Sequence, residues 1–394
     1  MAFIKLCVLV FVFIGFILSQ FTVALGFYDL ALVGSFSVNV IFVGFVSYIY
    51  LLSRVGVISF PVRVLPVLFM YLLFLFVFLY HFIYAYVLSL AAHTRNSHVV
   101  FLVFYVVMPL FGYVLFYRDD DYGKRWVLFF LVLLFLVSLW FSTVYGDIRS
   151  YYVAYGGQGF QFNYQAIGAI VFVLFVYVQN QKSLFLSYLA WFSALGCCYV
   201  VGARSELISL ILVFFLNFLL IGKNVFSLFY VRFFVVGIYI LGLILFVLFV
   251  LVASYQSEIA ALDLSLSERL SILSSNLEYI FQSPFWGAYS AYESGRYAHN
   301  LLSVWVDFGF PSFLLLCCIF SFVLFRYLSI LPIMRSCTTF KCGLILHLSV
   351  VFLMFTFKDY GYFIFPLSLG VYILVERRYI AFRRNSKMGL KYAF

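Results

Sequence analysis

Charged residues are scarce in this sequence. Only 10% of the 394 residues are Asp, Glu, Lys or Arg, whereas 66% are hydrophobic and 23% are aromatic. A soluble protein of this length could bury a large core, but it could not cover its surface with so few charges. The apolar composition also extends along the whole chain, so the sequence predicts an all-α, polytopic integral membrane protein.

Two further features are missing. No Gly-rich phosphate-binding loop of the nucleotide-binding type occurs, and the predicted inner loops are too short to hold a nucleotide-binding domain. No cysteine falls in a predicted outer loop, so disulfides are not expected. The seven cysteines lie in predicted spans or inner segments and are Cys7, Cys197, Cys198, Cys317, Cys318, Cys337 and Cys342.

Apolar stretches long enough to cross a bilayer recur along the chain. A spanning helix needs roughly 20 apolar residues, and about twelve such windows can be placed. The first begins at residue 3 without a small-residue cleavage site, which indicates a retained span rather than a signal peptide. The pairs around Arg204 and Lys358 can also be interpreted as single broken helices. The predicted spans are 3–24, 30–52, 64–90, 99–117, 126–145, 162–178, 184–201, 205–221, 231–252, 301–325, 342–357 and 362–375.

The basic residues predict how these spans are oriented. Lys and Arg in short loops favour the cytoplasmic side, and twelve spans with a cytoplasmic C-terminus place 18 of the 24 Lys and Arg residues inside. Both termini are then cytoplasmic. The net charge of +10 favours contact with anionic membrane lipid and not with nucleic acid. The cations left on the outer side are Arg95, Arg149, Arg204, Arg269, Arg296 and Lys358.

The longest segment outside the predicted spans is the outer loop at 254–298. The residues Ser265 to Glu268 fit a capping box, and Leu266, Leu270, Leu273, Leu277 and Ile280 then recur at helical spacing. A short amphipathic helix tethered at both ends suits the bilayer interface, where it could cover a cavity. The alternative is a helix that only packs on its neighbours.

Four short motifs around this loop resemble the ordered signature of the O-antigen polymerase and ligase superfamily. The similarity covers residues 202–325 within a single multispanning domain of residues 1–394. One departure is visible, because Gly309 is followed by Phe-Pro where the family often has a second glycine. The motifs are Gly202-Ala203-Arg204-Ser205, Ser267-Glu268-Arg269, Ser283-Pro284-Phe285-Trp286-Gly287, and His299-Asn300 followed by Phe308-Gly309.

The resemblance implies an inverting, metal-independent glycosyltransferase without a cofactor in the bacterial inner membrane, acting on its periplasmic face. Its donor and acceptor would be undecaprenyl diphosphate-linked oligosaccharides, with a chain-length regulator membrane protein as a further candidate partner. A polymerase passes the growing chain to another lipid-linked repeat, whereas a ligase passes it to lipid A core. The compact outer loop favours the polymerase.

Two residues are the candidate catalytic groups. A diphosphate leaving group gains negative charge, which a guanidinium in a low-dielectric site would stabilise, and Arg204 stands between two apolar spans. Its alternative role is a salt bridge with Glu206 or a contact with the surface. The attacking hydroxyl must lose a proton, and His299 at the start of a predicted helix is the candidate base. Its alternative is a structural histidine.

Further outer residues are candidates for substrate binding. Asn300 could orient His299 or bind a sugar hydroxyl, while Arg269, Arg296 and Arg149 could extend the cationic surface toward the diphosphate. The three arginines could equally be ordinary surface charges. No metal site is predicted.

The remaining polar clusters are predicted to have structural and not catalytic roles. The segment His93 to His98 is predicted to be a solvated loop, Asp119 to Asp121 a cytoplasmic loop, and Lys358-Asp359 a local ion pair. His81 and His347 lie in apolar spans, where packed, hydrogen-bonded histidines are expected.

Two functions of another class, a lipid-linked oligosaccharide flippase and a secondary transporter, remain alternatives. A flippase would have two related halves, and no such repeat is visible. A transporter would need mid-membrane ionisable residues, and the predicted spans contain few.

Overall fold

The computed structural model describes an all-α protein. Within the described part of the chain there are thirteen continuous helices and no strand, and eight helices are long and apolar enough to cross a membrane. The class of polytopic membrane protein predicted from composition is therefore confirmed. The described residues are 2–24, 36–55, 61–87, 95–117, 121–145, 164–179, 183–221, 225–254, 264–289, 291–292 and 300–387.

Each of the twelve predicted spans overlaps one helix or one continuous helical run, and the thirteenth helix is the predicted amphipathic one. The first run is α1 (Ala2–Cys7), η1 (Val8–Ile14) and α2 (Gly15–Ala24). The others are α4 (Phe36–Val55), η2 (Val62–Val64) with α5 (Leu65–Val87), α6 (Arg95–Phe116), α7 (Asp121–Tyr145), α9 (Tyr164–Val178), α10 (Leu184–Val201), α11 (Arg204–Ile221), α12 (Val225–Ser254), α13 (Leu264–Gln282), α14 (Leu302–Met334), α15 (Thr338–Thr356) and α16 (Ile364–Lys387).

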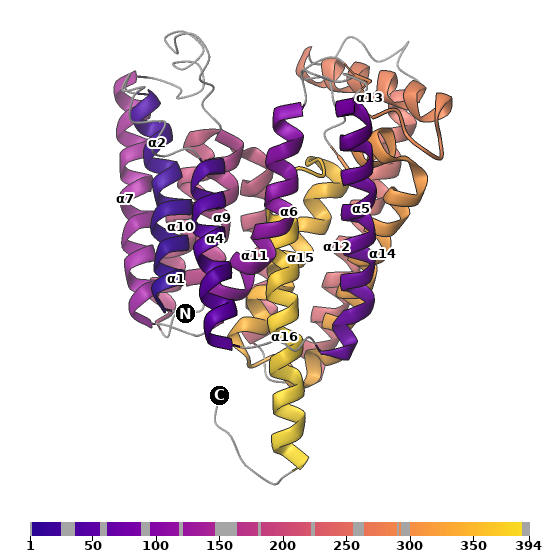
Figure 1. Ribbon diagram of the computed structural model, residues 1–394. Helices are drawn as coiled ribbons and strands as arrows, with labels where there is room; N and C mark the ends of the chain where they lie inside the picture. Colours follow the sequence, from indigo (N-terminus) through magenta and orange to yellow (C-terminus); the bar gives the residue numbers. More distant parts are fainter. Residues whose placement is uncertain are drawn as a thin grey trace.

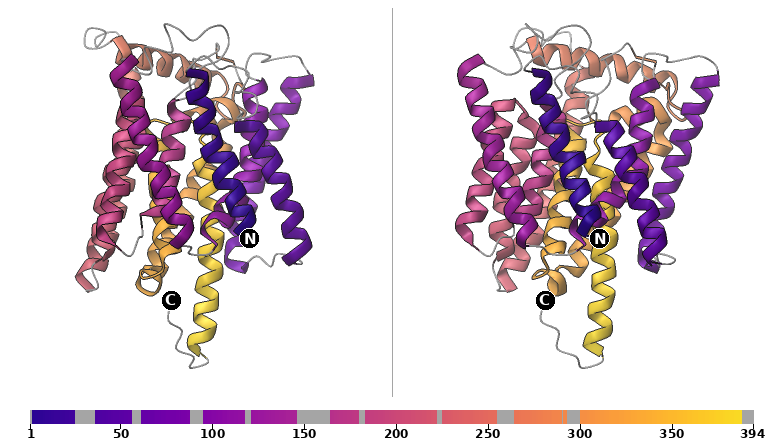
Figure 2. Two further views of the ribbon diagram at one scale, coloured as in Figure 1. Left: turned by 90° about the vertical axis from the view of Figure 1, so that its left-hand side faces the viewer. Right: turned by 60° about the vertical axis from the view of Figure 1, so that its left-hand side comes forward.

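The helices form one bundle with two distinct ends. Helix α13 lies across one end, and α16 projects beyond the other helices at the opposite end (Figures 1 and 2). We call these the α13 end and the α16 end. Arg95 and Arg204 begin helices at the α13 end, Arg269 lies in α13, and Lys358 follows α15 there. The described cations predicted to be outside thus share one end of the bundle.

The spans on either side of Arg204 are two helices that form an antiparallel hairpin. Helix α10 ends at Gly202, whose φ of 82° is the left-handed conformation that glycine adopts most readily. The chain then reverses, and the Trp191 indole N–H donates to the Leu210 carbonyl at 3.0 Å. Helices α15 and α16 also pack against each other on either side of the turn at residues 357–363. The interpretation as single broken helices is wrong at both places.

Helix α16 is longer than the hydrophobic pattern predicted. It continues twelve residues past the predicted end at Val375 because its polar residues find partners on neighbouring helices. Arg326 donates to both carboxylate oxygens of Glu376 at 3.0 and 3.1 Å, and Arg378 donates to the Tyr117 carbonyl at 2.5 Å. Charge-assisted bonds of this kind hold the helix where apolar burial ends.

Helix α14 is broken at Gly309, just before the Phe-Pro pair where the sequence departs from the family pattern. Gly309 has φ 78° and ψ 174°, so residues 302–308 and 310–334 are two helical segments. The segment that follows α13 packs against this break, since the Phe310 N–H and the Trp305 indole N–H both donate to the Pro284 carbonyl, at 3.0 and 2.9 Å. Two motifs more than twenty residues apart, Ser283–Gly287 and Phe308-Gly309, are thereby in direct contact.

Replacing Gly309 by alanine should destabilise the protein strongly. A Cβ at this position would stand 1.9 Å from the Phe285 carbonyl oxygen, and the positive φ adds roughly 1–2 kcal/mol of strain. Gly237→Ala is the matched control, because no atom lies within 4 Å of its added Cβ and a helical glycine gains up to about 1 kcal/mol on this change. Thermal melting of the purified protein in detergent compares them, and equal melting temperatures for both variants would contradict the close contact.

Candidate functional site

The turn between α15 and α16 carries a buried ion pair at the α13 end. Lys358 Nζ lies 2.9 Å from Glu206 Oε1, and both side chains are almost fully buried. Lys358 also lies 5.3 Å above the ring of Tyr362, and Ser205 Oγ donates to Glu206 Oε2 at 2.8 Å. The predicted local pair between Lys358 and Asp359 is replaced by this longer-range pair, because the turn packs against the start of α11.

The ion pair between Lys358 and Glu206 leaves Arg204 without its predicted partner. Glu206, the residue that the sequence offered as its salt-bridge partner, is bound to Lys358 instead. Arg204 is exposed at the first position of α11, and no ion pair joins it to any other residue of the described chain. Its guanidinium is therefore available to an anionic ligand at the α13 end.

A second buried carboxylate, Asp307, lies in the short first segment of α14. It has no exposed surface, and its Oδ2 accepts hydrogen bonds from Tyr360 at 2.7 Å and Tyr292 at 2.9 Å. Tyr360 belongs to the same α15–α16 turn as Lys358, so one turn contacts both carboxylates. Buried charges at helix ends are costly, and those that persist usually have a specific role.

His98 extends this network to α6. The Tyr360 hydroxyl lies 2.9 Å from His98 Nε2, and the Tyr289 hydroxyl lies 2.5 Å from Nδ1. The imidazole is 2% exposed. The prediction of a solvated loop is therefore wrong for His98: its segment begins a helix, and the ring packs against Phe78 and Phe101. We call Asp307, Tyr360, Tyr292, His98 and Tyr289 the Asp307 network.

The hydroxyls of the network remain neutral donors. Burial, aided by the charge of Asp307, raises the pKa of Tyr289, Tyr292 and Tyr360 above the ordinary value. Burial also raises the pKa of Asp359 to about 6, although the neighbouring Lys358 lowers it. Asp359 therefore titrates close to neutrality in the turn that joins the two carboxylate sites.

Asn300 caps the start of α14, which begins two residues later at Leu302. Its side-chain oxygen accepts a hydrogen bond from Leu302 N–H at 3.0 Å, and its carbonyl accepts from Ser303 N–H at 3.1 Å. The Leu301 N–H donates to the Met354 carbonyl at 2.7 Å, which ties this helix start to the end of α15. Among the described residues, no acceptor is bound to the side-chain NH2 of Asn300, and this group stays the candidate for binding a sugar hydroxyl.

Several predicted site residues have no described position. His299, Arg296 and Arg149 lie outside the described residues, and of Arg269 only its place in α13 is described. Of the two predicted catalytic residues, the structure therefore places Arg204 alone. Leu301, two residues after His299, donates a hydrogen bond to the end of α15. Glu206, two residues after Arg204, pairs with Lys358 in the turn that follows α15.

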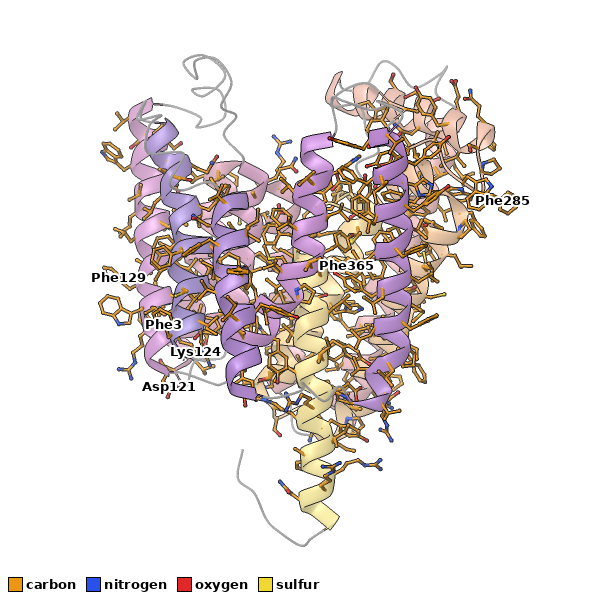
Figure 3. The ribbon with its side chains drawn as sticks, viewed as in Figure 1. Phe3, Asp121, Lys124, Phe129, Phe285 and Phe365 are labelled. Atoms are coloured by element: carbon orange, nitrogen blue, oxygen red, sulfur yellow. The ribbon has the colours of Figure 1, made fainter. Side chains whose placement is uncertain are left out.

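Helix α13 has the predicted amphipathic character over its second half. Leu273 and Ile280 are buried against the bundle, Leu277 is half-buried, and Glu278 and Ser271 are exposed. The helix contacts α12 and α14. Phe281 near its end and Phe285 and Trp286 beyond it are 66–80% exposed, and Phe285 points away from the bundle in Figure 3. Exposed aromatic side chains of this kind are typical of a membrane–water interface.

Two histidines in the apolar spans and one residue of the acidic segment have described positions. His81 and His347 are packed, hydrogen-bonded histidines as predicted, since their Nε2 atoms lie 2.9 and 3.1 Å from the carbonyls of Trp286 and Phe320. Asp121 lies at the opposite end of the bundle from α13, beside Lys124 (Figure 3). Asp121 is therefore remote from the Asp307 network, while Asp119 and Asp120 lie outside the described residues.

From the sequence, Asp307 and Tyr360 were assigned no role, and Lys358 was predicted only to pair with Asp359. A signal was present, because an ionisable residue inside or beside an apolar segment is a candidate functional residue. Their partners could not be identified, since each contact joins residues 15 to 262 positions apart.

Comparisons with known proteins return no match: no family model, no curated protein and no solved structure is similar to this chain at a significant level. The class that the fold defines is a polytopic all-α membrane protein. The resemblance to the O-antigen polymerase and ligase superfamily stays a prediction from the motifs.

Proposed function

We propose that this chain is a membrane glycosyltransferase of the O-antigen polymerase type. It would join undecaprenyl diphosphate-linked oligosaccharide repeats by attack of a sugar hydroxyl on an anomeric carbon. The reaction would take place at the α13 end of the bundle.

The observation that carries the proposal is that Arg204 is exposed and has no ion-pair partner within the described chain. It is the exposed cation of the first family-like motif, and the acid beside it is occupied by Lys358. A guanidinium that is not neutralised within the described chain can bind two oxygens of a diphosphate at once. It can also stabilise the charge that develops there as the glycosidic bond breaks.

The positions of the family-like motifs support a site at the same end of the bundle. Gly202 to Ser205 form the α10–α11 turn, Ser283 to Gly287 close the break at Gly309, and Asn300 caps α14. The turn at 357–363 links these parts through Lys358 and Tyr360. Motifs spread over about a hundred residues thus share one end of the bundle, as a common site requires.

The proposed orientation follows from the same geometry. Basic residues concentrate toward the α16 end, and positively charged loops favour the cytoplasm. The α13 end would then face the periplasm, where α13 and its exposed aromatic residues would lie at the bilayer surface. His299, which precedes the cap residue Asn300, remains the candidate base.

Deletion of the gene with gel analysis of lipopolysaccharide tests the proposed function. Loss of a polymerase should leave core with a single repeat in place of the ladder. Bare core with polymer retained on the carrier lipid would instead indicate the ligase. Accumulation of unpolymerised repeats on the cytoplasmic face would indicate a flippase, and an unchanged ladder would contradict all three.

A further inference from the structure

A cavity of about 340 Å³ opens at the α16 end, remote from the site described above. It lies among the C-terminal ends of α9 and α11 and the N-terminal ends of α10 and α15. Its lining combines a few polar groups with an aromatic wall. The lining includes the polar residues Gln179, Thr338 and Lys341 and the aromatic residues Trp191, Phe214 and Phe218.

Gln179 and Lys341 bring hydrogen-bond donors to this cavity. Gln179 is 5% exposed, its Oε1 accepts from Asn217 at 2.6 Å, and its Nε2 is buried without a partner in the described chain. Lys341 adds a cation that no ion pair neutralises within the same residues. Thr338 and Lys341 lie in the first turn of α15, where unpaired backbone N–H groups favour negative charge.

A buried amide N–H without an acceptor is energetically costly. An anion with several acceptor oxygens would satisfy it and pair with Lys341 at the same time. A phosphate group supplies both the acceptor oxygens for Gln179 and the negative charge that pairs with Lys341, whereas a cation would be repelled by Lys341.

One part of the cavity wall is aromatic. Trp191 and Phe214 pack with ring centroids 4.7 Å apart, and Phe218 is 72% exposed. Exposed aromatic residues on the outside of a membrane bundle contact lipid chains. The donors and this wall are adjacent, which matches a molecule with an anionic head and an apolar tail.

We propose that this cavity binds the phosphate of an anionic membrane lipid, with an acyl chain against Trp191, Phe214 and Phe218. Lys341 and Gln179 Nε2 bind the phosphate oxygens, and the start of α15 adds its N–H groups. The site does not depend on the proposed glycosyltransferase activity, because its residues lie at the other end of the bundle.

Melting of the full-length protein in nanodiscs tests this site. Phosphatidylglycerol should raise the melting temperature of the wild type above its value in phosphatidylcholine. Lys341→Gln and Gln179→Leu should each remove at least half of that increment. Arg232→Gln, which removes an exposed cation of α12 that does not line the cavity, should keep it.

Native mass spectrometry of the wild type in detergent supplies a second measurement that needs no variant. One phosphatidylglycerol should stay bound under conditions that remove phosphatidylcholine. An equal increment in all four proteins, or no preferential retention, would overturn the proposal. Inorganic phosphate that stabilises the protein as well as the lipid does would show a site for free phosphate and would also overturn the lipid assignment.

Discussion

Arg204→Ala should abolish chain elongation while the protein remains inserted and abundant. Removing one group that stabilises developing charge typically lowers the rate on the order of 100- to 1,000-fold. That loss would eliminate the ladder of long chains on a lipopolysaccharide gel. The fold should tolerate the change, because Arg204 is exposed and no ion pair within the described chain holds it.

Two companion variants make this result specific. Arg204→Lys keeps the charge but not the planar fork, so it should restore only part of the elongation. Arg232→Ala removes an exposed cation from α12 and should leave the ladder unchanged. A normal ladder from well-expressed Arg204→Ala protein would eliminate Arg204 as the diphosphate-binding group.

Lys358→Met should produce the largest loss of stability. It leaves Glu206 charged, fully buried and without the cation that now lies 2.9 Å away. Breaking a buried ion pair from one side costs about 3–5 kcal/mol, since the remaining charge is uncompensated. The purified variant should melt at a clearly lower temperature and accumulate less in the membrane.

The double variant Glu206→Leu, Lys358→Met is the matched control. Replacing both charges by apolar groups is often neutral or stabilising, so its melting temperature should return to the wild-type value or exceed it. Recovery would show that the loss arises from the unpaired carboxylate and not from the packing of the turn. A single variant that melts like the wild type would show that the pair contributes little.

The sequence predicted the helical architecture well and the partners of its polar residues poorly. The positions of α10 and α11 followed from the length of their apolar stretches, and the second half of α13 followed from hydrophobic periodicity; both are local properties. The end of α16 did not, because Glu376 and Arg378 are held by residues of α14 and α6. The predicted local pair at Lys358 failed for the same reason, as its partner lies 152 positions earlier in the chain.

By itself the sequence determined that this chain enters a membrane and which segments form helices, because hydrophobicity and backbone hydrogen bonding in lipid leave few alternatives. It also placed Gly202, Gly309 and Asn300 in the motifs that resemble the family signature. Only the tertiary structure decided that Glu206 binds Lys358, that Arg204 is left exposed, and that Asp307 joins Tyr360 and His98. Buried polar groups must find partners wherever the packing of distant helices places them, and no local pattern in the chain encodes that choice.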